Sequence, residues 1–274
     1  MIVVTGATGN VGRELVRALV GAGEQVTAVS RRPGQLPAGV RHVPADLADL
    51  SDPQSLRTAL DGATALFLLV AGEEPVKILD LAREAGVRRV VLLSSQGAGT
   101  RPEVYRHPVL FEEAVRGSGL DWTILRSGGL NSNAFAWAGT IRADRTAAAP
   151  FGDVGLPTVD PADVAEVAAA ALREDGHAGR TYELTGPAAV TPRERAAAIG
   201  EALGTPVRFV EQTREEARAQ LLAFMPEPVV EGTLAILGLP LPAEQAPGPD
   251  VEHVLGRAPR TFADWAARTA PAFQ

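Results

Sequence analysis

Three side chains that could give up a proton follow one predicted strand, the apolar run at residues 88–97. Ser95 lies near the end of that run, and Tyr105 and His107 come in the loop after it. The pKa of histidine suits acid chemistry near neutral pH, whereas a tyrosine, with an ordinary pKa of about 10, is a slow proton donor there. The alternatives are a helix cap or surface position for His107 and an aromatic cover over a pocket for Tyr105. We take these three residues as the catalytic candidates.

A second group of residues could hold a phosphate. In the stretch TGATGNVG, Gly6, Gly9 and Gly12 follow an apolar run and precede a helical pattern. This arrangement indicates a dinucleotide-binding turn, in which glycines permit the tight turn, the approach of the pyrophosphate and the packing of the helix on the strand. The free N–H groups of the helix would face the phosphates. A purely structural turn is the alternative. The predicted contacts are Gly6, Thr8, Gly9, Asn10, Val11 and Gly12.

The residues after the second apolar run indicate which dinucleotide is bound. An acidic residue there would bind the ribose hydroxyls of NAD, but this chain has Arg31 and Arg32. Two guanidinium groups favour the 2′-phosphate of NADP(H), because each can bind a phosphate with two hydrogen bonds. A solvated basic pair is the alternative. Asp46 and Leu47 are placed to meet the adenine, although Asp46 could equally start a turn.

The elements that must position these residues are short apolar runs that alternate with helix-length segments. Most of the runs lack the polar alternation of a half-exposed strand, which favours a parallel sheet covered by helices on both faces. We therefore predict an α/β fold with a doubly wound parallel sheet (Rossmann), whose ligands bind beyond the carboxyl ends of the strands. The runs lie at residues 2–5, 25–30, 40–45, 63–72, 88–97 and 121–129.

After Gly128 the pattern loosens, and the rest of the chain predicts helices near 160–173, 191–203 and 212–224 and a strand at 180–186. Residues 191–194 form a capping-box pattern, and residues 260–270 return to a helical period. The segment 239–250 has the Pro, Ala and Gly content of a surface loop. Three acidic residues precede prolines suited to the first helical position. They are Asp52, Glu74 and Asp160.

We expect one unit of residues 1–274, with a dinucleotide-binding core at 1–127 and a small C-terminal α+β lobe at 128–274 that partly returns to the core. The lobe should form the substrate pocket. Phe135 and Trp137 could instead be core residues. Glu112 and Glu113 are interpreted as solvated or structural. The predicted pocket residues are Gln96, Asn131, Phe135 and Trp137.

Composition excludes several classes of function. The formal net charge is −7 and no segment is dense in Lys or Arg, which weighs against nucleic-acid binding. The chain has no cysteine, so it has no disulfides, Cys-bound metals or thiol nucleophiles, and no metal-ligand spacing stands out. The strand at Ile2 has no charged leader and the longest apolar run is too short to span a bilayer, so we expect a cytoplasmic protein without a membrane partner. A homodimer is left open.

Several motifs in order resemble the NmrA-like branch of the atypical short-chain dehydrogenases/reductases. They include TGATGNVG, VVLLSSQGAG, FEEAVRGSGLDWTILRSGG, VDPADVAEVAAAAL and PRTFADWAA. The resemblance implies an NADP(H)-binding Rossmann protein; some members reduce quinones or dyes, and others act as redox sensors. It also implies that the backbone at Gly128 and Gly129 passes the nicotinamide. Four further residues near strand ends are assigned to the cofactor site, namely Val70, Ala71, Ser94 and Ser95.

The chain departs from the wider family at one position. Short-chain reductases pair a tyrosine with a lysine four residues later, whereas Val109 stands at that place after Tyr105. Without the lysine, reduction of a simple ketone is disfavoured, and an acceptor that delocalises its new charge fits better. We therefore predict an NADPH-dependent reductase of a small conjugated substrate such as a quinone, an enone or a dye, in bacterial secondary metabolism. The alternatives are a non-catalytic NADP(H) sensor and a redox-neutral isomerase, epimerase or dehydratase.

Overall fold

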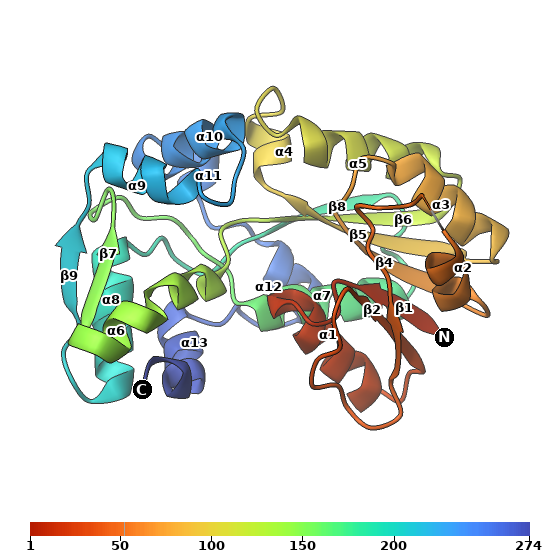
Figure 1. Cartoon of the computed structure of the whole chain (residues 1–274), viewed down its shortest axis with the longest axis horizontal. Coiled ribbons are helices and arrows are strands. Elements are labelled where there is room, and N and C mark those ends of the chain that lie inside the picture. Colours follow the sequence, from red (N-terminus) through yellow and green to blue (C-terminus); the bar gives the residue numbers. More distant parts are fainter. Residues whose placement is uncertain (52) are drawn as a thin grey trace.

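A computed structural model describes residues 1–51 and 53–274, so the predicted helix start at Asp52 lies outside the described residues. Its centre is a seven-stranded sheet in the order β3-β2-β1-β4-β5-β6-β8, and every neighbouring pair is parallel (Figure 1). The predicted doubly wound sheet is therefore confirmed. The strands are β1 (Ile2–Thr5), β2 (Val26–Ser30), β3 (Arg41–Pro44), β4 (Ala65–Leu69), β5 (Arg89–Ser95), β6 (Asp121–Ser127) and β8 (Arg180–Leu184).

Helices cover both faces of this sheet (Figure 1). One face packs against α1 (Asn10–Gly21), α7 (Pro161–Arg173) and α12 (Asp250–Leu255), and the other against α2 (Gln54–Leu60), α3 (Pro75–Glu84) and α5 (Arg106–Gly117). All the residues of β1 and β2 are buried. Strands covered on both faces must be apolar throughout, which explains the unbroken apolar runs of the sequence.

The C-terminal lobe has its own core. Trp265 of α13 (Phe262–Thr269) packs against Phe262, Phe135 and Phe273 with ring centroids 5.1–6.2 Å apart. A two-stranded parallel sheet borders this core, and the sequence analysis missed both of its strands. The lobe also contains η1 (Asn131–Trp137), α6 (Ala138–Asp144), β7 (Thr146–Ala149), α8 (Pro192–Leu203), β9 (Arg208–Glu211) and η2 (Ala270–Phe273).

Three further helices, together called the cover, lie at the boundary between lobe and sheet, near α4 (Gly97–Thr100) (Figure 1). The surface loop predicted at 239–250 is wrong in part, because it contains a helical turn whose Glu244 is only 2% exposed. The Pro, Ala and Gly content predicted that these residues are exposed to solvent. The Glu244 carboxylate is buried instead, in an ion pair with Arg101. The cover consists of α9 (Arg214–Leu221), α10 (Glu227–Gly238) and α11 (Pro242–Gln245).

Local signals placed several helix starts correctly. Asp160 caps α7 by accepting a hydrogen bond from Ala162, and Thr191 and Glu194 form the predicted capping box of α8. Asp160 is fully buried and also binds Arg268 of α13. Asp160 thus both caps α7 and links this helix to α13, near the C-terminus.

The first turn of α1 tests how closely this helix must approach β1. A Cβ atom at Gly12 would lie 2.2 Å from the carbonyl oxygen of Gly6, whereas one at Gly21 would meet nothing within 4 Å. Gly12→Ala should lower the free energy of unfolding by about 1–3 kcal/mol, because backbone must move. Gly21→Ala, in the same helix, should raise it by up to about 1 kcal/mol. Urea denaturation measures both, and equal effects would contradict the close approach.

Candidate cofactor and substrate site

The glycine turn lies at the carboxyl end of β1. Gly6 has φ +62°, in the left-handed region, and a Cβ there would lie 2.8 Å from the Leu69 side chain of β4. The N–H of Gly9 closes the turn on the carbonyl of Gly6 at 2.9 Å. The N–H groups of Asn10, Val11 and Gly12 precede the first helical hydrogen bond, from Arg13 to Gly9. The turn therefore presents backbone donors and the positive end of α1 to an anion.

A cavity of about 790 Å³ opens beside this turn. Arg31 and Arg32 line it, and in the described part of the chain neither guanidinium forms an ion pair with a carboxylate. The glycines leave no Cβ between the backbone and the cavity, so the residues fit a dinucleotide with a phosphorylated ribose. The lining residues are Gly6, Thr8, Gly9, Val29, Ser30, Arg31, Arg32, Ala45, Asp46, Leu47, Ala48, Leu69 and Ala71.

Two of the predicted cofactor residues are placed elsewhere. Ser94 donates a hydrogen bond to Glu112 at 2.7 Å and is buried with it, so its hydroxyl points away from the cavity. Val70 is half-buried against the core on the side of α2 and α3. Asp46 lines the cavity and accepts a turn hydrogen bond from the Ala48 N–H at 3.0 Å, as expected for a residue that starts a turn.

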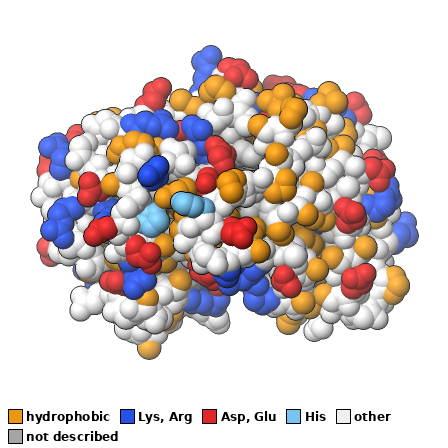
Figure 2. Space-filling model, turned by 180° about the vertical axis from the view of Figure 1, so that it is seen from behind, with side chains coloured by type: hydrophobic (Ala, Val, Ile, Leu, Met, Phe, Trp, Pro, Cys, Tyr) orange, Lys and Arg blue, Asp and Glu red, His pale blue; other side chains and the backbone are white. Residues whose placement is uncertain are grey.

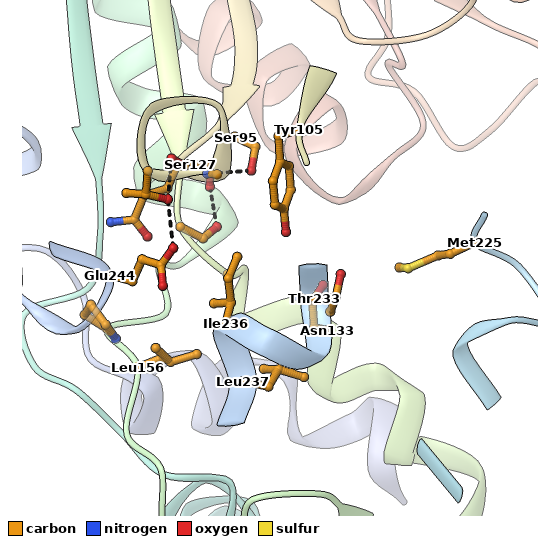
Figure 3. Close-up of a pocket in the computed structure, with 16 residues that line it drawn as sticks. Ser95, Tyr105, Ser127, Asn133, Leu156, Met225, Thr233, Ile236, Leu237 and Glu244 are labelled. Atoms are coloured by element: carbon orange, nitrogen blue, oxygen red, sulfur yellow. Dashed lines mark hydrogen bonds between the residues drawn. The ribbon is translucent and has the colours of Figure 1, made fainter. Parts of the chain in front are cut away.

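A second cavity, of about 240 Å³, lies beyond the carboxyl ends of β5 and β6 (Figure 3). The sheet side of this cavity is lined by residues that the sequence placed at strand ends, namely Ser95, Gln96, Gly128 and Gly129. Helix α10 closes the opposite side. Its charged lining residue is Glu244. The remaining lining residues are Gly97, Thr100, Tyr105, Ser127, Asn133, Leu156, Pro157, Met225, Thr233, Ile236 and Leu237.

Tyr105 points its hydroxyl into this second cavity, toward Thr233 of α10 (Figure 3). Burial raises the pKa of Tyr105 above its usual value, and the Thr233 hydroxyl is the largest opposing influence. The phenol is therefore neutral at physiological pH and can act as a donor but not as a base.

The other two catalytic candidates differ in position. Ser95 lines the cavity, and its oxygen accepts the Gly97 N–H at 3.2 Å, which leaves its own O–H free to donate. His107 does not line it: the Nε2 atom lies 2.5 Å from the carbonyl oxygen of Gly72, and the ring packs edge-on against Phe111. His107 thus joins α5 to the loop after β4 and does not cap the helix, whose first cap residue is Tyr105.

Three predicted pocket residues line neither cavity. Phe135 stacks on Phe273 in the lobe core, and Trp137 donates to the carbonyl of Ala148 at 2.8 Å. Asn131 is 1% exposed. Asn133, two residues later, lines the cavity instead, because the chain enters a 3₁₀ helix after Leu130 that changes which side chains face outward.

Sequence reasoning missed the residues that the cover and the turn between α9 and α10 contribute. Met225, Thr233, Ile236, Leu237 and Glu244 come from a part of the chain with no motif of its own. The apolar residues of α10 could have indicated a helix, but nothing in the sequence shows that it faces the ends of β5 and β6.

A buried charge network lies beneath the second cavity. Glu112 is 1% exposed and accepts hydrogen bonds from Ser94, from Arg126 at 2.8 and 2.9 Å and from Arg116 at 2.9 Å. Burial raises the pKa of this carboxyl, but these donors together outweigh it and the pKa lies below its usual range. Glu112 is thus an ionised structural residue that holds β5, β6 and α5 in register.

An ion pair attaches the cover to α4. Arg101 binds both oxygens of Glu244 at 2.8 Å, and Thr100 donates to the same carboxylate at 2.8 Å. Gln96 donates its side-chain N–H to the carbonyl of Ala243 at 3.2 Å. Burial raises the pKa of Glu244, but the bonds from Arg101, the Leu241 N–H and Thr100 outweigh it, so the pKa is lowered. The pair leaves no net charge at the cavity wall.

Acidic and basic side chains are interspersed on the face seen in Figure 2. Among residues 1–51 and 53–274, no helix has the length and apolar character to cross a bilayer. Within the same residues, no group of three His, Asp or Glu side chains is arranged to hold a metal ion.

The parallel sheet and the glycine turn beside a cavity at its strand ends define a dinucleotide-binding protein of the Rossmann type. A family model described as NAD(P)H-binding matches residues 6–175. The chain is 39% identical to the (4-alkanoyl-5-oxo-2,5-dihydrofuran-3-yl)methyl phosphate reductase of Streptomyces griseus, over 100% of this chain and 99% of the relative. It therefore belongs to the NAD(P)H-binding reductases, in the NmrA-like branch that its motifs resemble.

Two other relatives agree with this membership. The NAD(P)H azoreductase of Xenophilus azovorans is 33% identical over 100% of this chain and 99% of its own. The NADPH-dependent quinone oxidoreductase of Escherichia coli, solved with NADPH, has a TM-score of 0.78 at 25% identity and covers 98% of this chain and 99% of its own. The predicted nicotinamide cofactor and the reductase class are confirmed.

The two arginines at the first cavity test the choice of nucleotide. Replacing Arg31 and Arg32 together by alanine should raise the Kd of NADPH about 10–100-fold, because charge-assisted hydrogen bonds to the 2′-phosphate are lost. The Kd of NADH should not change. Arg83→Ala, which removes an arginine paired with Asp80 on α3 at 2.9 Å, is the control. Isothermal titration measures the affinities, and an equal loss for both nucleotides would reject the assignment.

The Arg101–Glu244 pair makes the attachment of the cover depend on pH. Since the pKa of Glu244 is lower in the folded protein than in the unfolded chain, its stabilisation is present above about pH 4.3 and is lost as the pH falls through the folded pKa. Glu244→Gln should lower the free energy of unfolding at pH 7 by about 3 kcal/mol and weaken its dependence on acid. Glu201→Gln, at an exposed position of α8, should change neither. Denaturation curves from pH 7 to about pH 4 provide the measurement.

Proposed function

We propose that this protein is an NADPH-dependent reductase of a small substrate in which a carbon–carbon double bond is conjugated with a carbonyl group. The observation that carries the proposal is the second cavity, whose charged lining residue is neutralised by Arg101 and whose polar groups are neutral donors. The relative from Streptomyces griseus is named for a dihydrofuranone substrate that bears an acyl group, which has this kind of conjugated bond.

The first cavity would hold the nucleotide. The N–H groups of Asn10, Val11 and Gly12 are suited to the pyrophosphate, and Arg31 and Arg32 to the 2′-phosphate. Gly129 is suited to a close approach by the nicotinamide. When bound, NADPH supplies a hydride to the β-carbon of the conjugated system.

The second cavity would stabilise the charge that then develops on the substrate. The O–H groups of Ser95 and Tyr105 can donate to the carbonyl oxygen, whose negative charge is spread over the conjugated system. Tyr105 supplies the proton that the α-carbon needs, and its phenolate takes a proton from water. Hydride and proton together complete the reduction.

The environment of Tyr105 also selects against simple ketones. Val109 lies one helical turn after Tyr105, where a lysine would lower the pKa of the phenol, and burial raises that pKa instead. An alkoxide would need full protonation in the transition state, whereas an enolate or a phenolate holds much of its own charge. A weak acid is thus sufficient for the conjugated substrate alone.

The test is anaerobic NADPH consumption with an acyl-dihydrofuranone, a quinone, an azo dye and a simple ketone. We expect consumption with the conjugated compounds, transfer of deuterium from labelled NADPH to the β-carbon, and incorporation of solvent deuterium at the α-carbon. Tyr105→Phe should lower kcat by about 10²–10⁴-fold and leave the Kd of NADPH unchanged. Binding without consumption would favour a sensor, and solvent exchange without NADPH loss would favour a redox-neutral enzyme.

The predicted division of the chain, its location and its partners are part of the same proposal. A dinucleotide-binding core at 1–127 and a pocket lobe at 128–274 would act on a small molecule in the cytoplasm, without a nucleic-acid partner. Both cavities are lined within one chain, so a single chain would suffice to bind the cofactor and the substrate.

A further inference from the structure

We propose that Thr233 of α10 is a positioning residue for Tyr105: its hydroxyl donates to the phenol oxygen and leaves the tyrosine hydrogen directed to the substrate. The inference rests on the proposed function, because it assigns the proton donor of that reaction. It makes the cover part of the reaction site, although the two residues are 128 positions apart in the chain.

The ring of Tyr105 is held by two glycines on opposite elements. A Cβ at Gly97 of α4 would lie 2.6 Å from the ring, so the ring packs directly on the backbone there. A Cβ at Gly232 of α10 would lie 2.3 Å from the side chain of Val104 and 3.7 Å from the Tyr105 ring. Residues 104–105 and α10 are thus in close contact immediately before Thr233.

The charges around the phenol do not replace the missing lysine. Arg101 lowers the pKa of Tyr105 and Glu244 raises it, and the two side chains neutralise each other as an ion pair. The acidic residues of α10, Glu227 and Glu231, are bound to Arg214 and Arg218 of α9. Among the described residues, Thr233 is therefore the group that opposes the effect of burial most strongly.

A hydrogen bond between the two hydroxyls would set the direction of the proton. Each O–H can donate once, so a bond from Thr233 to the phenol oxygen would leave the Tyr105 hydrogen for a partner in the cavity. The same bond would stabilise the phenolate that remains after the proton has moved to the substrate. Both residues line the cavity, and Figure 3 shows the phenol oxygen directed toward Thr233.

Kinetics of two Thr233 variants test this role. Thr233→Val keeps the shape but removes the donor, and we expect kcat for the conjugated substrate to fall about tenfold, with KM and the Kd of NADPH within about twofold. Thr233→Ser keeps the donor and should retain most of the activity. In the Tyr105→Phe background, Thr233→Val should have no further effect. An equal loss with serine and valine, or the same loss in the Tyr105→Phe background, would overturn the inference.

A second measurement needs no substrate. The chain has two tyrosines, so in a Tyr182→Phe background the ultraviolet absorbance of tyrosinate reports Tyr105 alone. Thr233→Val should move this titration to higher pH, and Thr233→Ser should not. A shift without any reduction of the substrate panel would reject the proposed function but support the arrangement. Reduction of the panel with no shift and no change in kcat would reject the role of Thr233.

Discussion

Every strand of the main sheet is parallel to its neighbours, and this constraint determines where the protein can bind anything. The carboxyl ends of all seven strands lie on one edge, and the strand order reverses between β1 and β4. The chain leaves β1 toward β2 and leaves β4 toward β5, so the loops diverge there and open a crevice. The first cavity lies at this point and the second lies farther along the same edge, at β5 and β6.

Glycines are frequent at this edge of the sheet, because segments of the chain approach one another closely where the strands end. Gly6, Gly12 and Gly97 all follow strand ends or begin helices there, and a Cβ at any of them would lie within 3 Å of a side-chain, backbone or ring atom of another residue. Buried charge lies one layer below. Glu112 and Arg126 join β6 to α5, so the loops above them start from fixed positions.

Sequence predicted the part of the molecule that is governed by local rules. Runs of apolar residues, the glycine turn, and the caps at Asp160 and Thr191 depend on neighbours within a few positions, and each is found in the structure. Whether residues 239–250 are exposed depended instead on a distant contact, because Glu244 of this segment is buried against Arg101, some 140 residues earlier in the chain. The side chains at 131–137 depended on the phase of a 3₁₀ helix. Composition and periodicity carry no information on such contacts, and this is why only the residues on the sheet side of the second cavity were predicted.

The glycines of α10 have a further consequence. A Cβ at Gly232, in the middle of α10, would lie 2.3 Å from Val104, and one at Gly238, at its C-terminal end, would lie 2.7 Å from the ring of Phe151. The helix therefore contacts its neighbours through backbone at both positions. The distance between α10 and the strand ends, across the second cavity, is therefore set by the absence of side chains at these two glycines rather than by the residues that line the cavity. A single methyl group at either glycine would push α10 away from the strand ends and enlarge the second cavity, without changing any residue that lines it.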